Sequence, residues 1–152
     1  MDLLAGDIGG TKTALLRGRW QDGRLEVLAE ARYDSTAYAD LAAPVREFLG
    51  DTPPPPRACF AVAGPVQPAP GGGTQARITN LPWQLDSARL ERALGIERIT
   101  LINDLAGVGY GVAVLGPDQV RTLQPGAPRS DGPRAVIGVG TGLGVALLVP
   151  QA

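Results

Sequence analysis

The sequence predicts an α/β fold in which a mixed sheet is flanked by helices. Two observations carry this prediction. Three strand-like segments joined by tight turns open the chain, and from residue 36 onward segments of helical period alternate with short apolar strands. The chain has 152 residues, which suits one domain or one domain and the start of another. Hydrophobic residues make up 44% and charged residues 19%, so the 21 glycines and 14 prolines indicate tight turns rather than disorder.

The opening segments form an antiparallel meander. Residues 3–8 are a short buried strand that ends in a glycine-rich turn, and residues 13–20 are the returning strand. The dipeptide Asp22-Gly23 is a strong hairpin signal. Residues 25–33 alternate apolar and polar side chains, which predicts a third strand with one face buried.

The apolar period then changes to that of a helix. Residues 36–49 place their large apolar side chains on one helical face. Pro44 should shift or kink the start of this helix, and Gly50 should end it. The prolines at 53–56 form a stiff spacer, and the apolar run 58–63 is a central strand buried on both faces.

The next segments repeat the alternation of strand and helix. Residues 65–75 are rich in proline and glycine and predict a loop, and residues 76–80 a short strand. Asp86 caps a helix that Gly95 ends, and residues 98–102 form another strand.

The last third of the chain contains a helix and two more strands. The helix opens at Asn103-Asp104, and the glycines within it indicate close backbone packing. Residues 116–134 are a candidate domain boundary. Strands at 135–139 and 145–149 flank a second glycine-rich turn.

Composition excludes several kinds of chemistry. The chain has no histidine, so it offers no Ser-His-Asp triad and no histidine-ligated metal. Its single cysteine, Cys59, cannot form an internal disulfide, and its apolar strand indicates a packing role. The net charge of −1 gives no excess positive charge for nucleic acid or an anionic membrane. The first residues resemble neither a signal peptide nor a membrane span, so we expect a soluble cytoplasmic protein.

Two glycine-rich turns are candidate phosphate sites. In the first, which runs from Gly6 to Lys12, adjacent glycines let backbone N–H groups converge on an anion, and Thr11 adds a hydroxyl. Asp7 could hold Mg²⁺, which prefers oxygen ligands. A plain glycine-rich hairpin turn fits this segment equally well. The second turn, residues 140–144, has the same composition and setting, which suggests two backbone cradles facing one chain of phosphates.

Polar residues near the ends of two other segments are candidate sugar contacts. Asn103 and Asp104 follow a strand and open a helix, where ligands usually bind in open α/β sheets. Asp104 could accept a proton from a sugar hydroxyl and Asn103 could orient the sugar, although both residue types also favour helix capping. Asn80 is a candidate loop ligand, and Trp83 is assigned to the core.

Five of these stretches occur in the order seen in bacterial glucokinases, which belong to the hexokinase and actin-like ATPase superfamily. The stretches are residues 6–11, 61–65, 79–83, 101–106 and 138–144. The resemblance implies the ribonuclease H-like small domain of that superfamily. It also implies phosphorylation of glucose at its 6-hydroxyl, with ATP as donor and Mg²⁺ as the metal.

The resemblance carries roles to individual positions. It implies that Asp104 is the catalytic base, that Asn103 and Asn80 bind the sugar, and that Asp7 lies near the metal. The residues it implies for ATP binding are Gly6, Asp7, Ile8, Gly9, Gly10, Thr11, Gly140, Thr141 and Gly142.

The chain departs from the family at its end. In the family the polypeptide continues with a Glu-Gly-Gly-His sugar-binding segment, the adenosine site and a final helix. We therefore expect an amino-terminal domain at 1–115, a linker at 116–134 and the opening hairpin of a second domain at 135–152. Such a chain should be inactive alone and should self-associate through the apolar surface that the second domain would cover.

Two other functions stay open from the sequence. The chain could be a non-catalytic half-domain that binds phosphate or sugar weakly, or part of a kinase for another hexose. A sugar-sensing repressor of the related group would carry a DNA-binding helix-turn-helix before the first strand, and since that strand is predicted from about Leu3 we do not expect this function.

Overall fold

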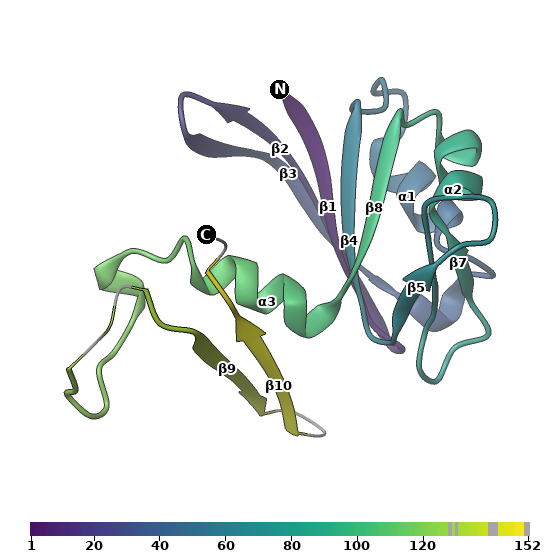
Figure 1. The fold of residues 1–152 in the computed structure, drawn as a ribbon. Helices are drawn as coiled ribbons and strands as arrows, with labels where there is room; N and C mark the ends of the chain where they lie inside the picture. Colours follow the sequence, from purple (N-terminus) through teal and green to yellow (C-terminus); the bar gives the residue numbers. More distant parts are fainter. Residues whose placement is uncertain (128, 130, 140–142, 151–152) are drawn as a thin grey trace. The chain divides into compact units, whose positions relative to one another are not determined.

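The amino-terminal part of the chain is built around a five-stranded sheet (Figure 1). The computed structural model describes residues 1–127, 129, 131–139 and 143–150. Strand order is β3-β2-β1-β4-β8; β1 runs parallel to β4 and β4 to β8, while β1, β2 and β3 form the predicted antiparallel meander. The strands are β1 (Asp2–Ile8), β2 (Lys12–Gln21), β3 (Arg24–Asp34), β4 (Arg57–Val62) and β8 (Arg98–Asn103).

The hairpin between β2 and β3 turns at the predicted dipeptide. Asp22 and Gly23 have φ values of 52° and 74°, as a tight hairpin turn of this kind requires. The prediction that one face of the third strand is buried is wrong for most of β3, which is exposed on both faces from Arg24 to Glu30, although Tyr33 near its end packs against the core. Alternation fixes which way side chains point but not whether anything covers them, and β3 is an edge strand.

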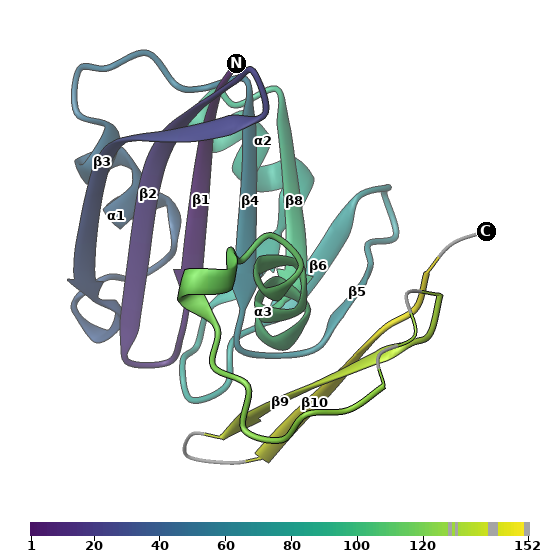
Figure 2. The ribbon, with the colours of Figure 1, turned by 90° about the vertical axis from the view of Figure 1, so that its left-hand side faces the viewer.

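Two helices cover one face of the sheet, as Figures 1 and 2 show. They are α1 (Ala42–Leu49) and α2 (Ser87–Leu94). The helix predicted over 36–49 is shorter, because a 3₁₀ turn at Ser35–Ala37 precedes α1. Pro44 lies in the first turn of α1, where a backbone N–H would have no acceptor within the helix, so its lack of an N–H costs no hydrogen bond. The core between helices and sheet includes Leu4, Ile8, Leu15, Val45, Phe60, Val62, Trp83, Leu90 and Leu101.

The ends of α2 follow the sequence signals. The Asp86 carboxylate accepts a hydrogen bond of 2.8 Å from the Arg89 backbone N–H, and Gly95 ends the helix with a left-handed φ of 67°. Gly50 ends α1 with a φ of 52°. These predicted caps are confirmed.

A small three-stranded antiparallel sheet lies between β4 and α2 in the sequence. Its strands are β5 (Val66–Pro68), β6 (Thr74–Arg77) and β7 (Gln84–Asp86), in the order β5-β6-β7. The prediction of a simple loop over 65–75 is therefore wrong. Proline and glycine do mark the turn between β5 and β6. They do not exclude a strand at Pro68, because β5 is an edge strand, where a proline is tolerated.

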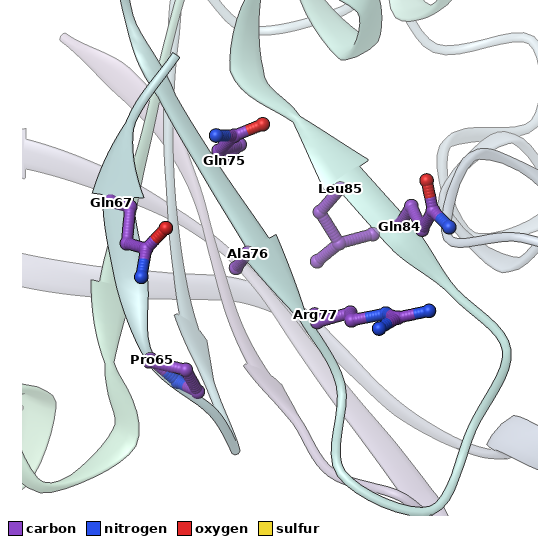
Figure 3. Close-up of a pocket in the computed structure, with 7 residues that line it drawn as sticks. All are labelled: Pro65, Gln67, Gln75, Ala76, Arg77, Gln84 and Leu85. Atoms are coloured by element: carbon purple, nitrogen blue, oxygen red, sulfur yellow. The ribbon is translucent and has the colours of Figure 1, made fainter.

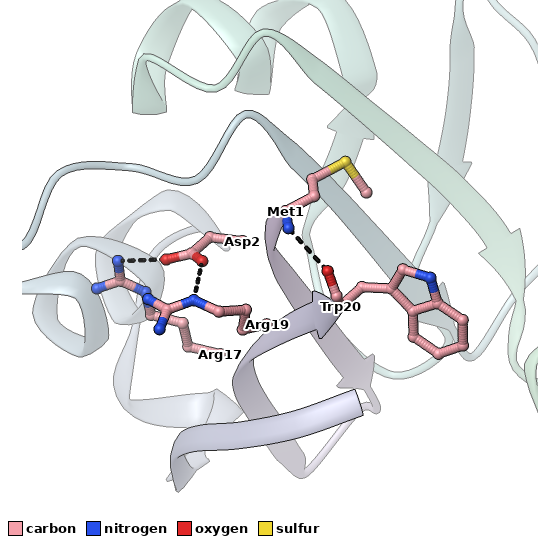
Figure 4. Close-up of polar contacts among 5 residues, drawn as sticks. All are labelled: Met1, Asp2, Arg17, Arg19 and Trp20. Carbon is pink, nitrogen blue, oxygen red and sulfur yellow. Dashed lines mark hydrogen bonds and ion pairs between the residues drawn. The ribbon is translucent and has the colours of Figure 1, made fainter. Parts of the chain in front are cut away.

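Charged contacts hold the start of β1 against β2 (Figure 4). Asp2 accepts from Arg19 at 2.9 Å and from Arg17 at 3.2 Å, and the Met1 amino group donates to the Trp20 carbonyl at 2.8 Å. The hydrogen bonds from the two arginines lower the pKa of Asp2, and Arg19 contributes most. These contacts lie at the opposite end of β1 from Asp7.

The chain divides into two compact units, Met1–Asp104 and Leu105–Ala152. Helix α3 (Asp104–Val112), a 3₁₀ turn (Pro117–Gln119) and the antiparallel strands β9 (Arg134–Val139) and β10 (Leu143–Leu148) follow the sheet in sequence. Within the second unit Leu105 lies against Gly138 and Gly144, and buried Gly109 lies against Leu148. The predicted close packing thus holds at Gly109 but is wrong at Gly111, where a Cβ would meet open space. Residue 115 as a domain boundary stays a prediction.

Candidate functional site

The candidate residues gather at the carboxyl end of the parallel strands. Ile8 pairs with Val62 and Val62 with Asn103, so β1, β4 and β8 end in one row. This edge of a parallel sheet is where ligands bind in open α/β folds. The structure therefore brings together Asp7, Asn103 and Asp104, which lie far apart in the sequence.

Asp7 points to the face of the sheet opposite the α1–α2 core. It pairs in register with Ala14 and Ala61, whereas its neighbour Ile8 is fully buried. The Asp7 side chain reaches solvent, yet desolvation by the surrounding protein raises its pKa and the negative charge of Asp104 raises it further. The two carboxylates are thus close enough to repel each other.

This pair fits a magnesium ion that is shared with phosphate. No cluster of three or more His, Cys, Asp or Glu side chains is found within the described part of the chain. Mg²⁺ commonly binds through one or two carboxylates and completes its shell with water and substrate phosphate oxygens. A cation beside Asp7 and Asp104 would also relieve their mutual repulsion.

The turn between β1 and β2 approaches a second turn closely. The Gly9 N–H donates to the Lys12 carbonyl at 2.9 Å, which closes the first turn. A Cβ atom on Gly10 would lie 2.5 Å from the Thr79 carbonyl oxygen, so this position requires glycine. The turn at Thr79 and Asn80 therefore lies directly beside the candidate phosphate turn.

Two buried hydroxyl groups support the candidate phosphate turn from inside the protein. Ser35 donates to the Gly9 carbonyl at 2.9 Å, so Thr13, whose hydroxyl is 2.9 Å from that of Ser35, donates to Ser35. The Ser35 backbone N–H also donates to the Thr11 carbonyl at 3.0 Å. Both hydroxyl side chains are fully buried. Sequence reasoning did not predict this pair, because Ser35 lies 26 residues from Gly9 and no local sequence pattern predicts such a contact.

Asn80 has the backbone geometry of a positioned loop residue. Its φ is 65°, a left-handed value that asparagine tolerates better than most residues, and its side chain is exposed. Backbone bonds of 2.9 Å from Thr79 to Ala63 and from Ala63 to Ile8 tie this turn to the end of β1. Trp83, buried as predicted, donates through Nε1 to the Tyr38 carbonyl at 3.1 Å.

Asn103 and Asp104 are the link between β8 and α3. The Asn103 side-chain amide donates to the Gly64 carbonyl at 3.1 Å, which ties the end of β8 to the turn after β4. Gly64 has no room for a Cβ, since the Arg77 carbonyl lies against it. Asp104 is half-buried and lies in the first turn of α3, where a helix favours negative charge.

The remaining predicted positions are described only in part. Gly140, Thr141 and Gly142 lie outside the described residues. Strands β9 and β10 pair antiparallel on either side of them, with Val139 opposite Leu143. Cys59 is half-buried in β4, and desolvation raises the pKa of its thiol, which suits a packing role.

A pocket of about 500 Å³ that sequence reasoning did not predict lies on the small sheet (Figure 3). Each of the three strands contributes one glutamine side chain to its wall, and Arg77 adds a charged one. Its lining residues are Pro65, Gln67, Gln75, Ala76, Arg77, Gln84 and Leu85. It contains none of the predicted site residues. Because residues 65–75 are predicted to be a loop, the sequence pattern offers no reason to expect a pocket on a sheet there.

Among the residues that the structure describes, no helix is long and apolar enough to cross a bilayer.

Comparisons with known proteins agree with the motifs. A sequence profile of the family described as Glucokinase matches residues 4–152. A glucokinase from Nostoc punctiforme is 45% identical over 152 residues, which are 98% of this chain and 43% of that protein. The chain thus spans less than half the length of this relative.

Solved structures show the same fold. The crystal structure of a glucokinase from an Antarctic psychrotroph matches 99% of this chain and 47% of that one, with a TM-score of 0.84 and 29% identity. A Balamuthia mandrillaris glucokinase in complex with glucose matches 97% of this chain and 44% of that one, with a TM-score of 0.58 and 26% identity. The predicted α/β fold of the actin-like ATPase kind is confirmed.

Proposed function

The chain belongs to the glucokinase family, and from this premise we propose that it supplies the amino-terminal part of an ATP-dependent glucose kinase. One observation of the structure carries the proposal. The carboxyl edge of β1, β4 and β8 gathers a glycine turn, the Asn80 turn and the Asp7–Asp104 pair from separate segments. Phosphoryl transfer needs this combination, because it depends on positioning and on charge neutralisation.

Asp104 is the proposed general base. It accepts the proton of the attacking hexose hydroxyl as that oxygen bonds to the γ-phosphorus of ATP and the bond from this phosphorus to the bridging oxygen breaks, so that ADP leaves. Its place in the first turn of α3, half-buried, holds the carboxylate at the strand edge while leaving it accessible. The repulsion between Asp7 and Asp104 supports this role, because it indicates that the two carboxylates lie near each other at this edge of the sheet.

The glycine turn is the proposed site for the phosphates of ATP. The turn offers the backbone N–H groups of Gly10 and Thr11 and the Thr11 hydroxyl, while the Gly9 N–H closes the turn, and no side chain obstructs approach at the glycines. Asp7 would hold Mg²⁺, which when bound neutralises phosphate charge. Gly140, Thr141 and Gly142 are proposed as a second phosphate turn by family resemblance.

The side-chain amides of Asn80 and Asn103 are the proposed sugar ligands. An amide both donates and accepts hydrogen bonds, which matches the hydroxyl groups of a hexose. Asn80 is exposed beside the phosphate turn, and Asn103 is tied to the Gly64 turn at the same edge. Glucose is the proposed hexose, in keeping with the glucose-bound relative.

The chain provides one part of the machinery. It spans 43% of the Nostoc punctiforme relative, so turnover is proposed for the completed enzyme, in which this chain is fused to the part of that glucokinase that it does not cover. The proposed organisation is a domain at 1–115, a linker at 116–134 and the first hairpin of a second domain at 135–152. For the 152-residue chain alone, the alternative is a half-site that binds ATP·Mg²⁺ or glucose without turnover.

A coupled assay for glucose 6-phosphate tests the proposal. The completed enzyme should phosphorylate glucose, and Asp104→Asn should lower kcat about 10²- to 10⁴-fold while leaving the circular dichroism spectrum unchanged. Asp118→Asn, which alters an exposed carboxylate of the 3₁₀ turn, is the matched control. Near-normal turnover of Asp104→Asn would reject the assigned base. Calorimetry of the 152-residue chain with ATP·Mg²⁺ and with glucose tests the half-site alternative.

A further inference from the structure

Lys12 has a special place in both sequence and structure. It is the only lysine among 14 Lys and Arg residues, and it directly follows the candidate phosphate turn. Its own carbonyl closes that turn by accepting the Gly9 N–H at 2.9 Å. The start of the Lys12 side chain is therefore fixed relative to the turn.

The alternation of β2 places Lys12 on the same face as Asp7. Ala14 pairs directly with Asp7, so their side chains leave the same face of the sheet. Lys12 is two residues from Ala14 and shares that face, whereas Thr13 between them is fully buried on the other. Lys12 is exposed, so its flexible stem can reach across the open edge of the sheet.

One oxygen of the carboxylate opposite Lys12 is engaged by another residue, and this carboxylate forms no ion pair with Lys12 among the described residues. Lys12 pairs in register with Asp34 on β3. Asp34 Oδ1 instead accepts from the Thr36 backbone N–H at 2.9 Å and from the Thr36 hydroxyl at 2.6 Å. Among the ion pairs of the described residues, none includes Lys12. The ammonium group is thus available at an edge that already carries the Asp7 and Asp104 carboxylates.

We propose that Lys12 is a phosphate-binding residue whose ammonium contacts the polyphosphate of the nucleotide at the Gly9–Thr11 turn. The inference rests on the proposed kinase function and adds a residue to it. Backbone N–H groups supply dipoles, whereas a polyphosphate brings several full negative charges close to two carboxylates. A lysine is a mobile point charge that suits this task, and no other lysine of the chain can substitute for it.

Amine acylation with mass spectrometry tests the inference without relying on catalysis. The chain has two reactive amines, the Lys12 side chain and the Met1 amino group. ATP·Mg²⁺ or tripolyphosphate should slow acylation of Lys12 in the 152-residue chain or in the completed enzyme. The Met1 amine should react at an unchanged rate, because it lies at the opposite end of β1 and donates to the Trp20 carbonyl. It is an internal control in the same molecule.

Kinetics of the completed enzyme give the second measurement. Lys12→Met should raise KM for ATP about ten- to hundredfold, Lys12→Arg should restore most of the affinity, and KM for glucose should change little. Arg24→Met removes one positive charge at the far end of the β2–β3 hairpin and should leave both constants unchanged. If Lys12 acylation is unaffected in both proteins, or if Lys12→Met leaves KM for ATP unaltered in an active enzyme, the inference is rejected while the kinase function stands. Protection of Lys12 in an enzyme without turnover would support phosphate binding and reject the kinase function.

Discussion

The buried hydroxyl pair of Thr13 and Ser35 behind the candidate phosphate turn leads to a quantitative prediction. Ser35→Ala removes the hydrogen bond to the Gly9 carbonyl and also the acceptor of the Thr13 hydroxyl. Thr13 is 0% exposed, so water cannot replace its lost partner. A buried polar group without a partner costs about 1–3 kcal/mol, so we expect Ser35→Ala to lower the free energy of unfolding by about 2 kcal/mol.

A double-mutant cycle separates this cost from general loss of packing. Thr13→Val alone leaves the bond between Ser35 and Gly9 in place and should cost about 1 kcal/mol. Adding Thr13→Val to Ser35→Ala removes the orphaned hydroxyl, so the double variant should be at least as stable as Ser35→Ala. The coupling energy between the two positions should be about 1 kcal/mol.

Urea unfolding followed by tryptophan fluorescence measures these differences. Trp83 is 2% exposed and reports on the first unit, and Trp20, which is exposed, is replaced by phenylalanine throughout. Amide hydrogen exchange at Gly9 should accelerate in Ser35→Ala. In the control Ser87→Ala, which loses a 3.0 Å bond from the Thr74 N–H in the small sheet, exchange at Gly9 should be unchanged. The reasoning fails if Ser35→Ala costs less than about 0.5 kcal/mol, or if the two single costs simply add.

Three further predictions follow from the same edge of the sheet and from the second unit. Asp7→Asn should raise the urea midpoint near pH 7. The folded state raises the pKa of Asp7 above its ordinary value of 3.8, so the wild type loses stability as pH rises from 3.8 through the folded-state pKa. The difference in urea midpoint between Asp7→Asn and wild type should therefore vanish at lower pH. A difference that stays constant at all pH values would contradict the prediction. Gly10→Ala should lower stability by about 1–3 kcal/mol, because its Cβ would lie 2.5 Å from the Thr79 carbonyl, whereas Gly71→Ala, which has open space, should be nearly neutral by the same urea assay. The 152-residue chain should self-associate, because Val139, Leu143 and other large apolar side chains of β9 and β10 are exposed, and a clean monomer in light scattering at micromolar concentration would disprove this.

Much of the fold could be predicted because its signals are local. The strand before the first glycine turn, the hairpin at Asp22-Gly23 and the caps at Asp86 and Gly95 each depend on a few neighbouring residues. The errors concern what covers or pairs with a segment. The exposed faces of β3 and the pairing of β5 with β6 depend on residues elsewhere in the chain, which a local pattern does not contain.

For the candidate site, the order of motifs in the sequence was enough to predict the chemistry of its residues and the family. Residue type limits the chemistry available, but the glycine turns and the Asn-Asp pair also fit plain turns and helix caps, so their phosphate and sugar roles came from the resemblance to the family and stay predictions. The tertiary structure alone decided which groups meet. Ser35 supports Gly9, Gly10 touches Thr79, and Lys12 shares a face with Asp7, because sheet register and close packing bring together atoms that the sequence separates.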